Sequence, residues 1–252
     1  EDLVSLFDST VDLATETGTS IFEFLGINTG VDGGTGLTVG TDTPYVPQGG
    51  SLLEAQDTIV TTERIVKIDT ALLAATAPLV NLLNSTVNAT PPDAHAGVID
   101  LSFRAKVMDT MPILAMDNSI MNVNSGSFVS LANQTILSLA GDFLSLINGS
   151  VFNVNSANGF LVYASGNSAF TVTGALINFG GTGDNEVNVM NNLTSETINM
   201  VAFSFINGAT NTQVTVNGTP IQNPGLGSVN LPNGGSLIQV DGPNATVDIQ
   251  GM

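Results

Sequence analysis

One short pattern recurs along the middle of the chain and constrains the fold more than any other feature. Two apolar residues, one small residue and another apolar residue return every seven to nine residues between positions 113 and 160. Four central copies are FVSL, ILSL, FLSL and VFNV, which begin at Phe128, Ile136, Phe143 and Val151. The residues between the copies are mainly Asn, Ser, Gly, Asp and Ala, most of which favour turns. The pattern therefore predicts short β-strands, each followed by a corner of about three residues.

Two arrangements of such strands are conceivable. Successive hairpins would favour two-residue turns such as Asn148-Gly149, but most of the corners in this chain have other compositions. A chain that bends at each corner and keeps winding forms a solenoid, in which like residues stack on like residues. The sequence thus predicts an all-β fold, a parallel β-solenoid with three strands and about 23 residues per coil.

The period of two along a strand predicts which side chains face the interior. The second and fourth residues of each copy should point inward, namely Val129, Leu131, Leu137, Leu139, Leu144, Leu146, Phe152, Val154, Leu161 and Tyr163. The first residues should then point outward although they are large and apolar: Phe128, Ile136, Phe143, Val151 and Phe160. Either these five residues turn inward at corners, or they form an exposed packing ridge that another segment or subunit covers.

The chain divides into three segments by composition. Residues 1–50 are predicted to form an acidic amphipathic helix followed by a Gly-rich linker, residues 51–183 the solenoid, and residues 184–252 a β-rich module or a continuation of the solenoid. The helix is predicted from apolar residues near helical spacing: Leu3, Leu6, Phe7, Val11 and Ala14. Residues 51–83 fit both a helix that begins with a capping box at Ser51 and strands after Thr58, and β-branching favours the strands.

The charge of the chain limits its partners. The 252 residues carry 22 acidic and only four basic side chains, a net charge of -18. Nucleic-acid binding needs Lys and Arg to neutralise phosphates and is therefore excluded, and an anionic membrane surface would repel the chain. No apolar run is long enough to insert into a membrane as a helix. Divalent cations, neutral glycans and other copies of the chain are the partner classes that remain.

One Gly-rich segment resembles a calcium-binding repeat. Gly180 to Asn188 reads GGTGDNEVN, which is similar to the nonapeptide G-G-x-G-x-D-x-U-x of calcium-binding β-rolls, with Asn185 in place of Asp. The resemblance implies calcium ligands at Asp184, Asn185 and Glu186. The alternative is a Gly-rich turn that leaves the solenoid, because the chain holds one copy of a motif that works in tandem.

The sequence offers few residues for catalysis. His95 is the only histidine and there is no cysteine, so a zinc site lacks its usual ligands. Asp117 and Asp142 are 25 residues apart, about one predicted coil, and could form the carboxylate pair of a glycan-cleaving enzyme or serve as corner residues. We predict no catalytic residue and no cofactor, and expect a protein that is not an enzyme.

The repeated pattern and its polar corners, from about Val98 to Gly180, resemble the β-solenoid shafts of secreted filamentous-haemagglutinin-type adhesins and related surface fibres. The resemblance implies an extracellular, elongated, non-catalytic protein. The chain begins with Glu1, which we interpret as the result of signal-peptide removal.

About five coils at ~4.8 Å would make a rod only ~25 Å long, with open strand edges at its ends. We therefore expect a self-assembling subunit of a filament, sheath or surface layer. The alternatives are a monomeric glycan-binding adhesin module and, with less support, a polysaccharide-cleaving enzyme.

Overall fold

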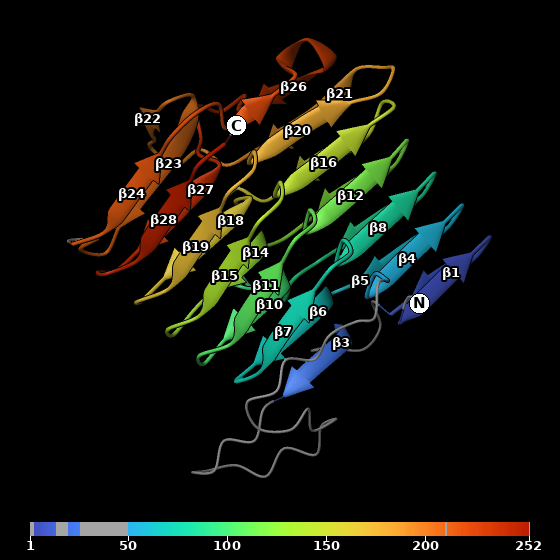
Figure 1. Cartoon of the computed structure of the whole chain (residues 1–252), viewed down its shortest axis with the longest axis horizontal. Coiled ribbons are helices and arrows are strands. Elements are labelled where there is room, and N and C mark those ends of the chain that lie inside the picture. The colour runs from blue at the N-terminus through green and yellow to red at the C-terminus, as the bar shows by residue number, and fades with distance from the viewer. Residues whose placement is uncertain (1–2, 14–19, 26–49, 210, 252) are drawn as a thin grey trace.

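A computed structural model describes residues 3–13, 20–25, 50–209 and 211–251, and it confirms the predicted all-β fold with parallel sheets (Figure 1). The described residues form four sheets, labelled A to D in the order in which the chain visits them. Neighbouring strands are parallel, apart from one antiparallel pair, β22–β23, near the C-terminal end.

The bounds of the strands, given in their order across each sheet, are as follows. Sheet A contains β1 (Val4–Phe7), β4 (Leu53–Gln56), β8 (Val80–Leu83), β12 (Leu114–Asp117), β16 (Leu144–Ile147), β20 (Ile177–Gly180) and β25 (Ile221–Gln222). Sheet B contains β2 (Thr10–Asp12), β5 (Ile59–Thr62), β9 (Thr86–Ala89), β13 (Ile120–Val123), β17 (Val151–Val154), β21 (Asn185–Val189) and β26 (Gly227–Asn230). Sheet C contains β22 (Glu196–Ile198), β23 (Val201–Ile206), β27 (Ile238–Asp241), β18 (Val162–Ser165), β14 (Ser127–Leu131), β10 (Gly97–Ser102), β6 (Arg64–Asp69) and β3 (Ser20–Leu25). Sheet D contains β24 (Gln213–Val216), β28 (Thr246–Ile249), β19 (Ala169–Val172), β15 (Ile136–Leu139), β11 (Lys106–Asp109) and β7 (Leu72–Ala75), and a 3-10 helix, η1 (Pro224–Leu226), lies between β25 and β26.

Each coil has four strands, so the predicted coil of three strands and about 23 residues is wrong. Leu53 pairs with Val80, Val80 with Leu114, and Leu114 with Leu144, which gives coils of 27, 34 and 30 residues. The apolar pattern has the period of one strand and its corner. It carries no information on how sharply each corner turns, and the corner angle decides whether three or four strands close a coil.

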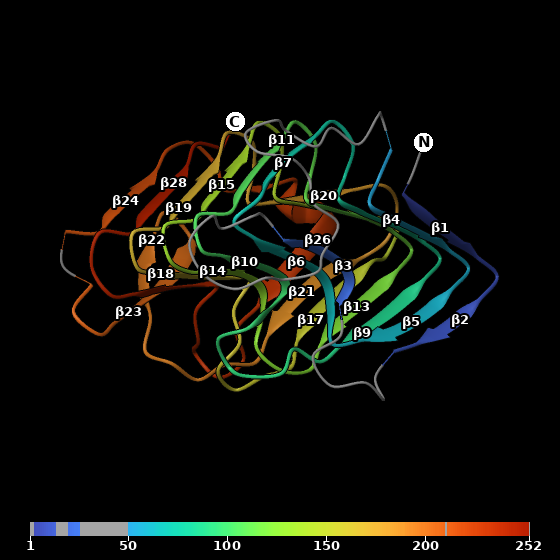
Figure 2. The same cartoon turned by 90° about the horizontal axis from the view of Figure 1, so that it is seen from below.

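The interior is one continuous apolar core between the four sheets (Figure 2). Phenylalanine rings pack edge-to-face along it. The ring centroids of Phe128 and Phe152 are 5.0 Å apart, and those of Phe143 and Phe170 are 5.3 Å apart. Aromatic pairs favour this geometry, which adds to the free energy gained by burying their area.

The corner between sheets A and B is built from two stacked positions. The first is in the left-handed backbone region and is filled by Asp57, Asn84, Asn118 and Asn148 in successive coils. Asp and Asn adopt this conformation more readily than other non-Gly residues. The second position is a small hydroxyl residue that points inward, and we call this series the Ser/Thr ladder: Ser9, Thr58, Ser85, Ser119 and Ser150. The N–H of each of the first four residues donates to the hydroxyl of the next coil, at 3.0–3.3 Å.

A second ladder runs along the outer face of sheet B. Its members, the Asn ladder, are Asn88, Asn122, Asn153, Asn188 and Asn230. The Nδ2 of each later residue donates to the Oδ1 of the residue one coil earlier, at 2.8–2.9 Å. Identical amides stack in this way because parallel in-register strands place them about one strand spacing apart.

The predicted N-terminal helix is not observed in the described residues of this segment, 3–13 and 20–25. Within the first segment, β1 pairs with β4, β2 with β5 and β3 with β6, so the described residues continue the sheets of the solenoid. The spacing of Leu3, Leu6 and Phe7 suggested a helix, but Leu3 and Phe7 are exposed and Val4 and Leu6 pack on the core with a period of two. The backbone of this segment forms hydrogen bonds with the strands of the adjacent coil, and the spacing of apolar residues within the segment gives no sign of these partners. Ala14 and most of the Gly-rich linker lie outside the described residues.

The ambiguous segment 51–83 consists of strands. β4 begins at Leu53, directly after the residues that fit a capping box, and β5 to β8 follow. β-branched residues after Thr58 thus predicted the local structure better than the apparent helix start.

Beyond residue 184 the sheets continue, but the order of the strands changes. β21 is followed by β22–β24, which lie at the far end of sheets C and D, and β25 and β26 then extend sheets A and B. The last two strands, β27 and β28, return to fill places between β18 and β23 and between β19 and β24 (Figure 1).

Candidate functional site

The corner between sheets C and D carries an exposed groove. Its pairs of residues in successive coils are Phe103–Arg104, Asn133–Gln134 and Gly166–Asn167, all with positive φ, between 43° and 68°. Backbone hydrogen bonds hold these corners in a stack: Arg104 N–H donates to the Asn133 carbonyl and Gln134 N–H to the Gly166 carbonyl, at 3.0 and 3.2 Å. The corner residues therefore follow one another along the solenoid axis.

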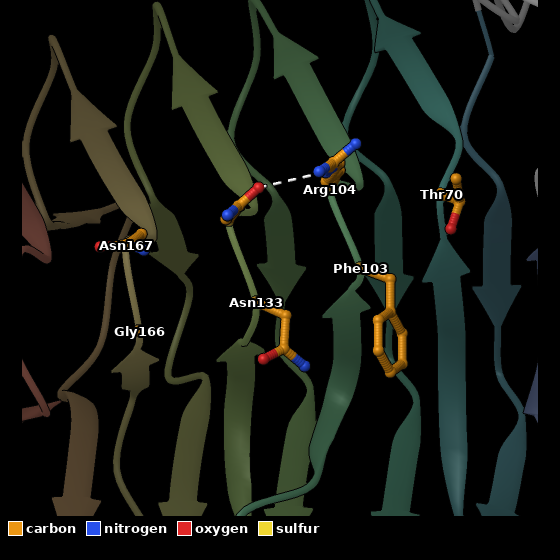
Figure 3. A pocket seen from close by; sticks show the side chains of 7 residues that line it. Thr70, Phe103, Arg104, Asn133, Gly166 and Asn167 are labelled. Carbon is orange, nitrogen blue, oxygen red and sulfur yellow. Dashed lines mark hydrogen bonds between the residues drawn. The ribbon is translucent and has the colours of Figure 1, made fainter. Parts of the chain in front are cut away.

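The groove has a volume of about 540 Å³ and is lined by these six residues and Thr70 (Figure 3). Its lining combines one aromatic ring, three side-chain amides, a hydroxyl and a guanidinium, with no carboxylate. The Arg104 Nε donates to the Gln134 Oε1 at 3.1 Å, which links the side chains of two coils (Figure 3). We call this site the corner groove.

Phe103 is the residue in the corner groove that the fold explains least. Its φ of 48° is strained for a large side chain, which costs about 1–3 kcal/mol, and its side chain is 57% exposed. The matching positions in the next two coils are Asn133 and Gly166, which adopt this backbone conformation more easily. The strained backbone, the exposure and the place in the groove make Phe103 the candidate contact residue of the corner groove.

The three calcium candidates differ in burial, and Asn185 has other partners. Asp184 is exposed and Glu186 is half-buried, whereas Asn185 is fully buried at the end of the Ser/Thr ladder. The Asn185 Oδ1 accepts from the N–H groups of Gly149 and Ser150 at 3.1 and 3.0 Å. Its Nδ2 donates to the carbonyls of Gly180 and Leu226, so the amide is fully used in closing the corner. Among the described residues, no group of three or more His, Asp or Glu side chains is placed to hold a metal ion.

The five residues of the predicted packing ridge divide between the two alternatives. Phe128, Phe143 and Phe160 are fully buried: Phe128 lies near the start of β14, and Phe143 and Phe160 lie just before β16 and β18. Ile136 remains 38% exposed and Val151 is half-buried on the outer face. No continuous ridge of five residues is formed.

The residues predicted to face inward are buried, but one of them lies on the outer face of its sheet. Val162 pairs with Val129, and Tyr163 pairs with the outward-facing Ser130. The strand is displaced by one residue from the repeated pattern. The Tyr163 ring lies 5.1 Å from the ring of His95, whose loop covers this part of sheet C, and burial together with the hydrogen bond to Asp241 raises the pKa of the Tyr163 hydroxyl.

The predicted carboxylate pair is not formed. Asp117 ends β12 and pairs with Ile147 at the end of β16, whereas Asp142 lies before the start of β16, so the two residues are at opposite ends of their strands. Both act at corners: the Asp117 Oδ1 accepts from the Asn148 Nδ2, and the Asp142 carboxylate accepts from the Ala175 N–H and the Asn178 Nδ2. His95 is exposed, and its backbone N–H donates to the Asp93 Oδ1 at 2.8 Å, as expected of a loop residue.

Comparisons with protein-family models, curated proteins and solved structures found no match to this chain. Within the described residues, no helix has the length and hydropathy needed to cross a membrane. The corner groove was not predicted from the sequence. The available signal was Phe103, an aromatic residue at a corner where other coils carry Asn-Gln or Gly-Asn.

Proposed function

We propose that this chain is a non-catalytic β-solenoid of an extracellular surface protein and that its corner groove binds a neutral polysaccharide. The observation that carries the proposal is the exposed Phe103 ring, held at a strained corner beside a row of amides. The extracellular location rests on the resemblance to fibre proteins and stays a prediction.

The chemistry of the groove favours a neutral sugar. The apolar face of a sugar ring packs on an aromatic ring, and its hydroxyl groups exchange hydrogen bonds with amides such as those of Asn133, Gln134 and Asn167. An acidic polysaccharide would meet only one cation in the groove, Arg104, on a chain with a net charge of -18. A peptide strand would find no extended edge here, because the corner backbone is left-handed.

The shape of the stack suits an elongated ligand. The lining residues come from four successive corners, spaced at the ~4.8 Å of neighbouring strands. A polysaccharide that lies along the solenoid axis can therefore contact several coils at once.

The prediction of a self-assembling filament subunit also remains open. Simple end-to-end stacking is less favoured at the C-terminal end, where β22 covers β23 in an antiparallel pair and β25 has only two residues. Such features hinder the pairing of a further strand at that edge.

Substitution of the exposed ring tests the proposal. Binding of neutral and acidic polysaccharides to the protein would be measured by calorimetry and affinity electrophoresis. Phe103→Ala should weaken binding of a neutral polysaccharide at least tenfold, about 1.4 kcal/mol. Phe7→Ala is the matched control, because Phe7 is 53% exposed on β1, away from the groove.

Two results would contradict the proposal. One is equal affinity of the Phe103→Ala variant and the unchanged protein for a neutral ligand. The other is binding of acidic polysaccharides alone, with affinity that falls steeply as salt is added.

A further inference from the structure

In sheets C and D, one strand position is skipped by the chain and is occupied later by β27 and β28. After β21, the strands β23 and β24 do not pair with β18 and β19 of the preceding coil. The C-terminal strands β27 and β28 lie between them instead, parallel to both neighbours. We call residues 237–251 the C-terminal strand pair and the place it fills the slot.

The C-terminal strand pair supplies both the core and the backbone bonds of the slot. Its inward side chains are fully buried: Ile238, Val240, Val247 and Ile249. On one side Leu161 N–H donates to the Leu237 carbonyl, and on the other Leu237 N–H donates to the Ala202 carbonyl. Removal of the pair would leave two facing rows of unpaired backbone groups, so the slot needs an occupant or has to close.

Polar contacts hold the start of this segment and its middle in the slot. The Asn191 side chain clamps the backbone of Ser236: its Nδ2 donates to the Ser236 carbonyl at 2.7 Å and its Oδ1 accepts from the Ser236 N–H at 2.8 Å. The Tyr163 hydroxyl donates to the Asp241 Oδ2 at 2.5 Å. The Asn191 side chain contacts only the backbone of Ser236, so the polar contact that depends on a residue type of the segment is the one between Tyr163 and Asp241. That contact and the buried side chains are the same whichever copy of the chain carries the segment.

The slot can also close without its occupant. Phe203 and Val162 both pair with Ile238, and Val214 and Phe170 both pair with Val247. A shift of β23 and β24 by one strand spacing, ~4.8 Å, would therefore place them on β18 and β19 with every side chain still on its own face. A released C-terminal strand pair thus does not oblige its own chain to unfold.

We propose that the C-terminal strand pair of one copy inserts into the slot of a second copy of the chain, so that copies join by strand exchange. The partner is the same chain because an identical segment reproduces both the buried side chains and the contact between Tyr163 and Asp241. The connection to β27 suits a hinge: it runs from Leu231 to Ser236, with Pro232, Asn233 and Gly234 exposed, and Gly234 has a φ of 72°. Exchange of an identical element between copies is a low-cost route to association. The proposal does not depend on the corner groove.

Single cysteines on two separate chains test the exchange, since the chain has no cysteine of its own. Thr171 and Asp248 are paired neighbours on the outer face of sheet D, within the reach of a disulfide. Differently tagged Thr171→Cys and Asp248→Cys proteins would be denatured, mixed, refolded together over a range of concentrations and then oxidised. We expect a 171–248 cross-link between chains whose yield rises with concentration.

The matched control is the pair Met108→Cys and Ser138→Cys, also paired neighbours on the outer face of sheet D, but in central coils. Strand exchange at the C-terminal end does not separate this pair, so its cross-link should stay at the level of random collision. The cross-link between residues 171 and 248 should exceed it about tenfold. The double variant Thr171→Cys/Asp248→Cys, oxidised as a dilute monomer, should no longer associate. Equal cross-linking of the two pairs in proteins with native circular dichroism would overturn the proposal.

Discussion

Asp109 places a carboxyl group inside the solenoid. It pairs with Ala75 and Leu139 in the neighbouring coils and is 3% exposed. Its Oδ1 accepts from the Met111 N–H at 2.9 Å, but its Oδ2 has no hydrogen-bond partner in the described part of the chain. Burial raises the pKa of the Asp109 carboxyl from 3.8 to about 7. The folded protein therefore holds this group protonated in acid and carries a buried charge above neutrality.

The raised pKa predicts the direction of a pH effect. Because the folded state binds this proton more tightly than the unfolded state, its contribution to stability is complete below pH 3.8 and is lost as the pH rises through about 7. A shift of about three units corresponds to about 4 kcal/mol. Asp109→Asn removes the charge, so the variant should gain stability over the unchanged protein as the pH rises from 5 to 8. Urea unfolding at each pH measures this gain.

Asp184→Asn is the control for Asp109→Asn, because Asp184 is an exposed carboxylate outside the core. It should give nearly the same stability difference at both pH values. If Asp109→Asn behaves in the same way, the buried charge does not influence folding.

Single residues also show the limits of prediction from sequence. The pattern allowed Phe128, Phe143 and Phe160 either to turn inward or to remain exposed, and the structure buries all three. Asn185 fitted a calcium motif by its neighbours, but its buried amide has four backbone partners that only the folded chain brings together. Local sequence shows residue types and spacing, whereas these partners come from other coils.

At the scale of the elements, the Ser/Thr ladder explains why the corner between sheets A and B can be buried. The Ser119 hydroxyl accepts from the Ser85 N–H at 3.0 Å and donates to the Asp117 carbonyl at 2.7 Å. Ser119→Ala leaves a buried N–H without a partner, which should lower the free energy of unfolding by about 1–3 kcal/mol. Thermal or urea unfolding at fixed pH measures the loss.

Ser119→Thr is the matched control, since Thr58 fills the same position two coils earlier and its Oγ1 accepts from the Ser9 N–H. The threonine variant should retain most of the stability that the alanine variant loses. Equal losses would mean that tight packing, and not the hydroxyl, accounts for the serine.

The elements themselves were largely predictable where the pattern was regular. Strands appear at the copies of the repeated apolar pattern, because each strand buries one face in the same core, and at the last regular copy β18 is displaced from the pattern by one residue. The number of strands per coil was not predictable, since it depends on backbone angles at residues such as Asn84 and Asn118. The corner groove was missed for the same reason: it forms only when Phe103, Asn133 and Gly166 stack at one corner.

At the scale of the whole molecule, charge is strongly unbalanced. The four basic residues lie between positions 64 and 106, so all charged side chains beyond Lys106 are negative. Among the described residues, burial raises the pKa of the Asp109 carboxyl to about 7, and burial raises that of the Asp100 carboxyl to about 6 against the opposing effect of Arg64. Lower pH therefore relieves both the long-range repulsion and the cost of two buried charges.

The melting temperature should be higher at pH 5 than at pH 8 in low salt. Addition of 0.5 M NaCl should raise the value at pH 8, because salt screens exposed charges over distances beyond a few ångströms. Buried charges are screened much less, so part of the difference should survive in high salt. Asp109→Asn should reduce the difference in melting temperature that remains in high salt. Each kcal/mol of change in the free energy of unfolding corresponds to about 2–4 °C.

Scanning calorimetry with EDTA present measures these values and keeps calcium from contributing. A melting temperature that is equal at the two pH values in low salt would show that neither the net charge nor the buried carboxyl groups oppose folding. A difference that vanishes completely in salt would assign the effect to surface repulsion alone, and the buried carboxyl of Asp109 would then have no measurable part in it.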